Sequence, residues 1–290
     1  MSGTKSATMT RILSAVIALP VYVFGLYTDV LYSLPVLVVS AVVSVVCLYE
    51  YYQIAGRGEG SDPFLALGIA GGIAVNVVMY LYAFGGFNVK PFDARVMFAM
   101  IALFLTAVLV AQTFKRPIKG GIYSLAVTVF GIAYIVFSFS HVILIKALNC
   151  GFCYILLLNV VVMMNDTGAY FGGVYFGRHK TNFAVSPNKS WEGYFTGLLF
   201  SVLSFIITNH LILLFAGVML FSMIEAVLLG IALSVLGHVG DLVESAIKRD
   251  GAIKDSGSII PGHGGMWDVF DALIFTTPLF YYYLMLRSLV

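Results

Sequence analysis

The sequence is short of charged residues: Asp, Glu, Lys and Arg together make up 10% of its 290 residues, against about 25% in a typical soluble globular protein. It has only three cysteines and a formal net charge of +2. So few cysteines exclude a disulfide-rich scaffold, and so small a charge gives no reason to expect nucleic-acid binding. The hydrophobic content of 60% excludes a disordered chain and a soluble enzyme, because a water-soluble fold of this size could not bury so much apolar surface.

Two of the cysteines, Cys150 and Cys153, have the CxxC spacing of redox motifs. No strand–helix–strand pattern surrounds them, as one would in a thioredoxin-like protein. They open a hydrophobic segment instead, where cysteine behaves as a small buried apolar residue. We therefore interpret them as packing residues.

Long apolar runs are abundant. A helix needs about 20 mostly apolar residues to cross a bilayer core of about 30 Å. The first run lacks a small-residue cleavage site and is followed by eight more, so we interpret it as a retained helix rather than a signal peptide. The sequence predicts an all-α polytopic integral membrane protein of about nine transmembrane helices, forming a single membrane domain over residues 1–290. The predicted spans are 12–27, 30–55, 64–87, 96–114, 121–145, 148–171, 193–215, 219–242 and 266–286.

Lysine and arginine are unevenly distributed among the predicted loops. Nine spans place the two termini on opposite sides of the membrane. With a cytoplasmic N-terminus, twelve of the 16 basic residues fall on the inner side and four on the outer side. Cytoplasmic loops are enriched in basic residues, so the sequence predicts a cytoplasmic N-terminus and an external C-terminus. Two polar stretches, 172–192 and 241–271, then lie on the cytoplasmic side.

The second polar stretch concentrates carboxylates and bases at two predicted helix ends. Asp268 and Asp271 are three residues apart at the start of the last span. Four polar residues at the end of the preceding span share one helix face through their i, i+3, i+4, i+7 spacing. They are Asp241, Glu244, Ser245 and Lys248. Converging carboxylates repel one another unless a cation or a basic partner lies between them.

A hard divalent cation such as Mg²⁺ suits such a group, because it takes oxygen ligands from carboxylates and phosphates. Lys248, Arg249 and Lys254 could bind the phosphate oxygens that remain. The alternative is an interfacial network of salt bridges with an ordinary Gly/Pro turn, since the helix dipole alone favours carboxylates at helix starts. The number of metal- and phosphate-compatible groups at one membrane face favours a functional site.

The first polar stretch follows an acid inside an apolar run. Asp166 lies within the sixth predicted span, where a charge is costly and indicates function; the alternative is a hydrogen bond to a neighbouring helix. Ser186-Pro187 favours the start of a turn or of a helix, from which Lys189 could reach a phosphate. Four glycines are spaced for close helix packing. They are Gly168, Gly172, Gly173 and Gly177.

Together these motifs, concentrated in 164–193 and 241–271, resemble the phosphatidate cytidylyltransferase (CDP-diacylglycerol synthase) family. The resemblance to the family's signature, with its spacing intact, rests on Ser245-x-x-Lys248-Arg249, Lys254-Asp255 and Pro261-x-His263-Gly264-Gly265-x-x-Asp268-x-x-Asp271. The family's upstream motifs resemble Asn165-Asp166-Thr167-x-Ala169-Tyr170 and Ser186-Pro187-x-Lys189-Ser190-x-Glu192-Gly193.

The resemblance implies an enzyme that makes CDP-diacylglycerol and pyrophosphate from CTP and phosphatidic acid. It implies an integral protein of the inner or plasma membrane whose active site faces the cytoplasm, with Mg²⁺ as cofactor, a second cation left open, and a homodimer by family analogy. The implied metal ligands are Asp241, Asp268 and Asp271. The implied catalytic residues are Lys248, Arg249, Lys254, Asp255 and His263. The implied substrate-binding residues are Asn165, Asp166, Ser186, Lys189 and Ser245.

One position departs from the family's pattern. The family generally has Asp-Arg-x-Asp, whereas this chain has Asp268-Val269-Phe270-Asp271. The missing arginine is a planar fork suited to phosphate or carboxylate. Its absence is compatible with reduced activity, with a role taken over by Arg249 or Lys248, with a substitution particular to this sequence, or with a protein that binds nucleotide or anionic lipid without turnover.

Two other functional classes fit the hydropathy. A secondary transporter would use Asp166 and the other acids for ion coupling, but transporters tend to have related halves and midplane sites, and these acids gather at one face. A CTP-dependent lipid kinase would use the same groups and would release CDP rather than pyrophosphate.

Overall fold

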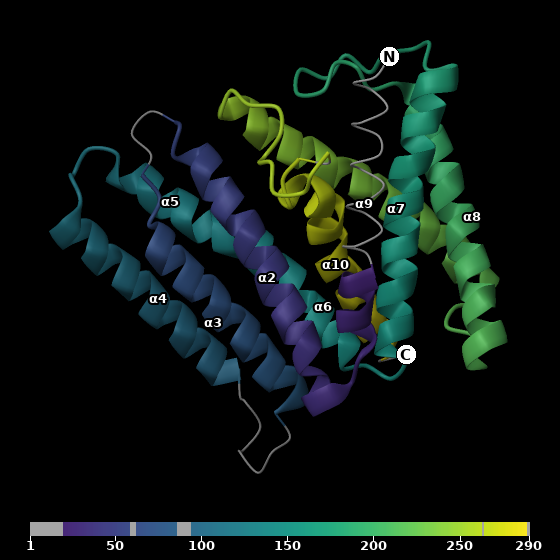
Figure 1. Ribbon diagram of the computed structural model, residues 1–290, viewed down its shortest axis with the longest axis horizontal. Coiled ribbons are helices and arrows are strands. Elements are labelled where there is room, and N and C mark those ends of the chain that lie inside the picture. The colour runs from purple at the N-terminus through teal and green to yellow at the C-terminus, as the bar shows by residue number, and fades with distance from the viewer. Residues whose placement is uncertain (1–19, 59–61, 86–93, 263, 289–290) are drawn as a thin grey trace. The chain divides into compact units, whose positions relative to one another are not determined.

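Helices account for the regular secondary structure of the computed structural model, which describes residues 20–58, 62–85, 94–262 and 264–288. Within these ranges the extended residues form only isolated bridges. Figure 1 shows the helices in chain order. They are α2 (Val30–Ala55), α3 (Leu65–Phe84), α4 (Ala94–Lys115), α5 (Gly121–Gly131), the π-helix η1 (Ile132–Phe137), α6 (Ser138–Lys146), α7 (Gly151–Phe176), α8 (Trp191–Ala216), α9 (Met223–Asp250) and α10 (Trp267–Arg287).

Eight helical segments of the described residues are long and apolar enough to cross a membrane, with α5, η1 and α6 forming one continuous span. A helix satisfies its own backbone hydrogen bonds, which the bilayer core requires. The predicted all-helical membrane architecture is thereby confirmed. The predicted first span begins among residues outside the described part, and its residues 20–27 are helical. The count of nine spans and the side on which each terminus lies stay predictions.

The chain is organised in two compact units. Unit 1 comprises Met1–Ala147 and Ile247–Phe270, and unit 2 comprises Leu148–Ala246 and Asp271–Val290. The boundary between them therefore falls within α9 and within α10. The single membrane domain expected from the sequence stays a prediction.

Buried polar side chains join the helices of unit 1. Ser40 of α2 donates to the Asn76 side-chain oxygen of α3 at 2.6 Å, and the Asn76 amide donates to Ser44 at 3.0 Å. The Tyr52 hydroxyl donates to the carbonyl of Thr128 in α5 at 2.8 Å. Such bonds hold helices together in lipid, where apolar contact between helices gives no hydrophobic advantage over contact with lipid tails.

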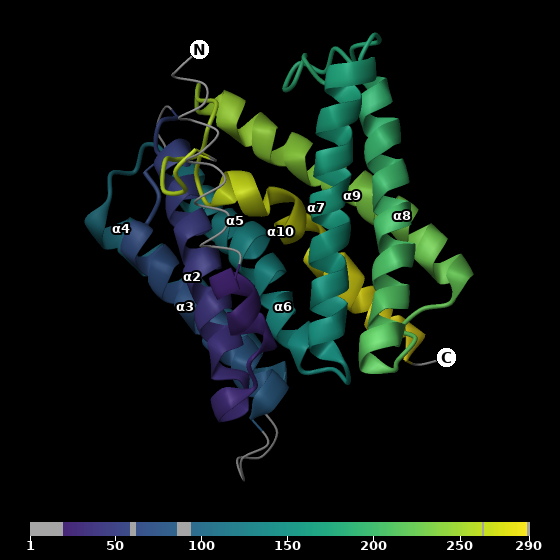
Figure 2. The same ribbon diagram turned by 45° about the vertical axis from the view of Figure 1, so that its right-hand side comes forward.

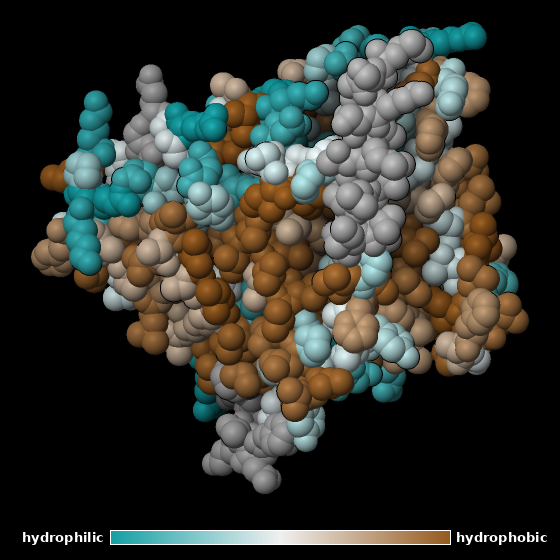
Figure 3. Space-filling view, viewed as in Figure 1, coloured by the Kyte–Doolittle hydropathy of each residue, from teal (hydrophilic) through white to brown (hydrophobic). Residues whose placement is uncertain are grey.

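The outward faces of the unit 1 helices are apolar. In Figure 3, hydrophobic side chains cover the middle of α2, α3 and α4, and hydrophilic ones gather towards one end of these helices. On α4, for example, Phe98 and Leu103 are each 71% exposed. Exposed large apolar residues on this scale indicate contact with lipid tails rather than with water.

Unit 2 is built on the helix pair α7 and α8, which run side by side in both ribbon views (Figure 1, Figure 2). A Cβ atom at Gly168 would lie 2.7 Å from the Phe200 Cβ, and one at Gly172 would overlap the Thr196 side chain. Glycine at these two positions therefore allows α7 to approach α8 closely. The predicted packing role is confirmed for Gly168 and Gly172.

Candidate functional site

A glycine brings the two acid-bearing helices of unit 2 together. A Cβ atom at Gly240 of α9 would lie 2.8 Å from the Phe275 Cβ and 3.2 Å from the Asp271 carbonyl oxygen of α10. A larger residue would push the helices apart. Because Asp241 follows Gly240 directly, this close approach brings Asp241 near Asp271.

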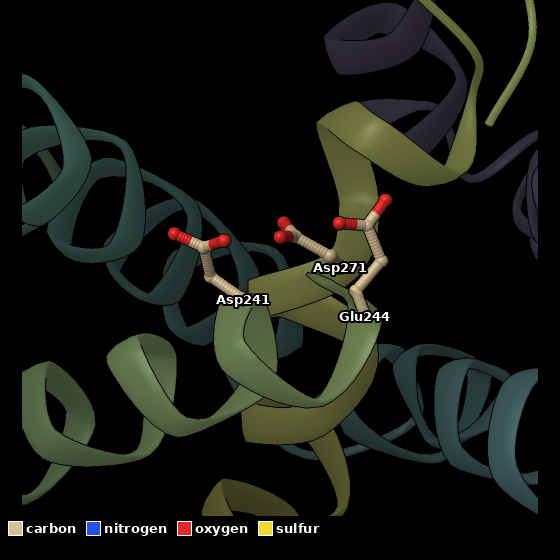
Figure 4. A group of neighbouring side chains, drawn as sticks. All are labelled: Asp241, Glu244 and Asp271. Carbon is tan, nitrogen blue, oxygen red and sulfur yellow. The ribbon is translucent and has the colours of Figure 1, made fainter. Parts of the chain in front are cut away.

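Three carboxylates meet at this crossing of α9 and α10. Asp241, Glu244 and Asp271 each offer an oxygen, and these oxygens all lie within 4.8 Å of one another. Figure 4 shows the three carboxyl groups pointing to the same side, with Asp271 between the other two. Glu244 is 1% exposed and Asp271 8%. Asp166 of α7 is accessible, and its charge acts on both Asp241 and Asp271. Buried like charges repel unless a cation joins them.

The donor set fits a hard divalent cation. Carboxylate oxygens are the ligands that Mg²⁺ and Ca²⁺ take in proteins, and Mg²⁺ keeps places for water and for substrate phosphates. Asp241 is half-buried rather than fully enclosed, which leaves one side of the group approachable. The group can therefore hold a metal ion that also binds a phosphate.

A lysine is positioned beside these acids by the start of α8. Ser190 caps this helix, its hydroxyl accepting from the Gly193 backbone N–H at 3.2 Å, as Ser does at helix N-termini. Lys189 precedes the cap, and its Nζ forms an ion pair with Asp241. Ser245, one turn along α9, donates to Asp241 at 3.4 Å. The structure thus brings the predicted residues Lys189, Asp241 and Ser245 together.

The other predicted residues of the first stretch are arranged differently. Asn165 is buried and accepts a hydrogen bond from Ser234 of α9 at 2.6 Å, while its amide donates to Asp166 at 3.3 Å. It therefore ties α7 to α9 and orients Asp166. Ser186 is half-buried in a turn closed by its N–H and the Phe183 carbonyl oxygen, 3.0 Å apart.

In unit 1 the predicted residues form a separate charged group. Lys248 donates to Asp268 Oδ1 at 2.6 Å, and the two side chains are only 11% and 10% exposed. Asp268 Oδ2 accepts from the backbone N–H groups of Ser256 at 2.8 Å and Gly265 at 2.7 Å. Both oxygens of Asp268 are thus engaged within unit 1.

The remaining predicted residues of this segment lie at the surface or outside the described part. Arg249 donates to the Ile253 carbonyl oxygen at 2.8 Å, closing the end of α9. Lys254 and Asp255 are exposed. His263 lies outside the described residues. Glu244 belongs to the group of three carboxylates but was not among the predicted metal ligands; its spacing from Asp241 was the signal for it. The metal role predicted for Asp268 stays a prediction.

These features define an integral membrane protein with an acidic, cation-compatible centre and with lysines paired to carboxylates. Residues 9–287 match the model of the cytidylyltransferase family. The chain belongs to this family.

Curated relatives carry the same name across several bacteria. A protein of Staphylococcus aureus (strain COL) named phosphatidate cytidylyltransferase is 30% identical over 277 residues, covering 95% of this chain and 96% of the relative. One of Bacillus subtilis (strain 168) with the same name is 37% identical over 193 residues, 66% of this chain and 68% of the relative. The resemblance drawn from the motifs is confirmed, and the transporter and kinase alternatives are not favoured.

Proposed function

We propose that this protein is a phosphatidate cytidylyltransferase, which converts CTP and phosphatidic acid into CDP-diacylglycerol and pyrophosphate. The observation that carries the proposal is the group formed by Asp241, Glu244 and Asp271 with Lys189 beside it. The family and the names of the relatives support the reaction.

The chemistry explains why such a group is needed. A phosphate oxygen of phosphatidic acid attacks the α-phosphorus of CTP, and the bond to the β-phosphate oxygen breaks as pyrophosphate leaves. The lipid phosphate is already an anionic nucleophile, so no strong base is required. The main obstacles are the repulsion between two polyanions and the charge that develops on the leaving pyrophosphate.

We assign Asp241, Glu244 and Asp271 as the residues that hold Mg²⁺. The ion would screen the phosphates from one another and orient CTP and the lipid phosphate. The three carboxylates supply the negative charge that retains it, and Asp166 adds to this field. A second cation and the metal role of Asp268 remain parts of the hypothesis.

The basic residues would bind the phosphate oxygens. Lys189 and Lys248 are each held by a carboxylate, Asp241 and Asp268 respectively, so each is oriented before substrate arrives. An ammonium group placed in this way stabilises charge without reorganising during the reaction. Arg249 and Lys254 are proposed to extend the phosphate contacts, and Ser186 and Asn165 to support the nucleotide side.

The site would serve a soluble and a membrane-bound substrate. We propose that it faces the cytoplasm, where CTP is found, and opens to the inner leaflet of the plasma membrane, where phosphatidic acid lies. The concentration of lysine and arginine in the loops of that side supports this orientation. A homodimer remains a prediction by family analogy.

The test is pyrophosphate release by the purified chain from CTP and phosphatidic acid in detergent micelles, with Mg²⁺ or with EDTA. We expect release that depends on both the lipid and Mg²⁺. Diacylglycerol in place of phosphatidic acid is the matched control: a lipid kinase would use it and would produce CDP. CDP as the product would overturn the proposal, and so would the absence of any CTP-dependent product.

A further inference from the structure

An acid inside the apolar helix α2 of unit 1 is almost completely buried. Glu50 is 3% exposed. Its Oε1 accepts from the Met266 backbone N–H, and its Oε2 from the Trp267 backbone N–H, each at 2.9 Å. These two amides lie at the start of α10, where backbone N–H groups lack partners within the helix and the helix dipole favours a negative charge. Glu50 therefore caps α10 from a helix more than 200 residues earlier in the chain.

The segment before α10 fits closely against this carboxylate. A Cβ atom at Gly257 would lie 2.6 Å from Glu50 Oε1, and one at Gly265 would lie 2.5 Å from Oε2. The Trp267 side chain is fully buried, and its ring lies edge-on to Tyr51, 5.6 Å away. Small residues at two positions and a large buried anchor at a third hold residues 256–257 and 265–267 against α2.

Ser256 connects Glu50 to Asp268. Its Oγ lies 2.8 Å from Glu50 Oε2 and 3.0 Å from Asp268 Oδ2. Its backbone N–H, like that of Gly265, donates to Asp268 Oδ2. Ser256 therefore contacts both acids, and Gly265, whose N–H binds Asp268, directly precedes the Met266 amide that Glu50 accepts. The other oxygen of Asp268 binds Lys248.

We propose that Glu50 is a positioning residue of the enzyme. It fixes residues 256–257 and 265–267, and through Ser256 and the start of α10 it sets the orientation of Asp268 and of the Lys248 ammonium group. This inference rests on the proposed function where it concerns catalysis. In this role Glu50 acts without contacting a substrate.

The direct test is amide hydrogen exchange in the full-length chain carrying Glu50→Gln. A glutamine keeps the size of the side chain, but its NH₂ group must then face one of the N–H or O–H groups that donate to the carboxylate. Hydrogen bonds to a charged group contribute enough that exchange of peptides covering 256–267 should become about tenfold faster or more. The matched control is Ser40→Ala, a buried hydrogen-bonded residue of the same helix, which should leave this segment at the wild-type exchange rate.

The catalytic part is tested by combining Glu50→Gln with Ser256→Ala. Each change should lower kcat/KM for pyrophosphate release by about tenfold, and Ser40→Ala should leave it unchanged. If Glu50 acts through Ser256, the double variant should match the more severe single variant within about twofold, because residues of one network are not additive. Independent contributions would multiply instead, and that result would overturn the connection through Ser256.

The outcomes separate this inference from the proposed function. If the wild-type chain releases no pyrophosphate, the proposed function fails, while the exchange experiment still decides whether Glu50 holds the segment. Wild-type exchange in Glu50→Gln, or faster exchange with unchanged turnover, would overturn the positioning role. Should Glu50→Gln not yield folded protein, Ser256→Ala alone must show the faster exchange and the loss of turnover, and an unchanged Ser256→Ala would refute the proposal.

Discussion

Carboxylates are arranged differently in the two units. In unit 1, Asp268 binds Lys248 with one oxygen and accepts backbone N–H groups with the other. In unit 2, Asp241, Glu244 and Asp271 bring oxygens within 4.8 Å of one another, and Lys189 pairs with Asp241 at the half-buried edge of this group. Removing one partner of a buried, fully hydrogen-bonded ion pair destabilises the fold, because it leaves the other charge buried and unpaired. Buried carboxylates that repel one another weaken the fold, and such a cost is typical of a site kept for function.

This comparison predicts that Asp271→Asn removes most of the activity without harming the fold. Loss of one of three metal ligands should lower pyrophosphate release by at least about a hundredfold, since metal stabilisation of phosphoryl charge is worth several kcal/mol. Asparagine keeps the size of the side chain and cannot add a charge among the neighbouring acids, so the unfolding midpoint in EDTA should equal that of the wild type or exceed it. Mg²⁺ should raise the midpoint of the wild-type chain and not that of the variant.

Glu225→Gln is the matched control for this change. Glu225 also lies on α9 in unit 2, but it is paired with Arg287 at 2.8 Å and accepts from Tyr283 at 2.9 Å. Its replacement should lower the unfolding midpoint slightly and preserve both activity and the Mg²⁺ shift. An Mg²⁺ shift that persisted in Asp271→Asn would remove Asp271 from the proposed metal site.

Asp268→Asn in unit 1, by contrast, is expected to lower the free energy of unfolding. The asparagine oxygen can still accept from the backbone, but its NH₂ group then faces the Lys248 ammonium, which is largely buried. Breaking a buried ion pair from one side costs about 3 kcal/mol or more of unfolding free energy. The measurement is denaturant unfolding in detergent, in EDTA so that metal binding does not contribute.

Neutralising both partners should recover part of this loss. In Lys248→Met combined with Asp268→Asn no ion remains buried at this position, so the double variant should be more stable than Asp268→Asn alone. If Asp268→Asn and Asp271→Asn instead had the same free energy of unfolding, the carboxylates of the two units would not differ in their effect on stability. Asp268 would then belong with the carboxylates kept for function.

Hydropathy was sufficient for most of the fold, because the bilayer allows few ways to satisfy a backbone. The runs 30–55 and 193–215, for example, correspond closely to α2 and α8. Hydropathy located the ends of the helices less well, because a helix can continue through polar residues beyond its apolar run. One example is α9, which continues to Asp250.

The sequence predicted the site only in part. Spacing placed Asp268 and Asp271 on one helix face, yet it does not determine which partner each one meets. That depends on close approaches such as the one at Gly240, which are properties of the packed structure. Glu50 was missed although its signal was present: it is an acid within an apolar run, as Asp166 is.

The smallest effect is expected at Val269, where this chain departs from the family's pattern. Val269 is 42% exposed in the first turn of α10, beside Asp268, so a longer side chain can extend outwards without disturbing the core. Val269→Arg should leave the unfolding free energy within about 0.5 kcal/mol and raise kcat/KM for CTP about three- to tenfold, since an arginine fork binds phosphate in a bidentate manner. Val269→Lys is the matched control, because it adds the charge without the fork. Equal gains from both would assign the effect to charge alone, and no gain from either would mean that Lys248 and Arg249 already supply what the family's arginine provides.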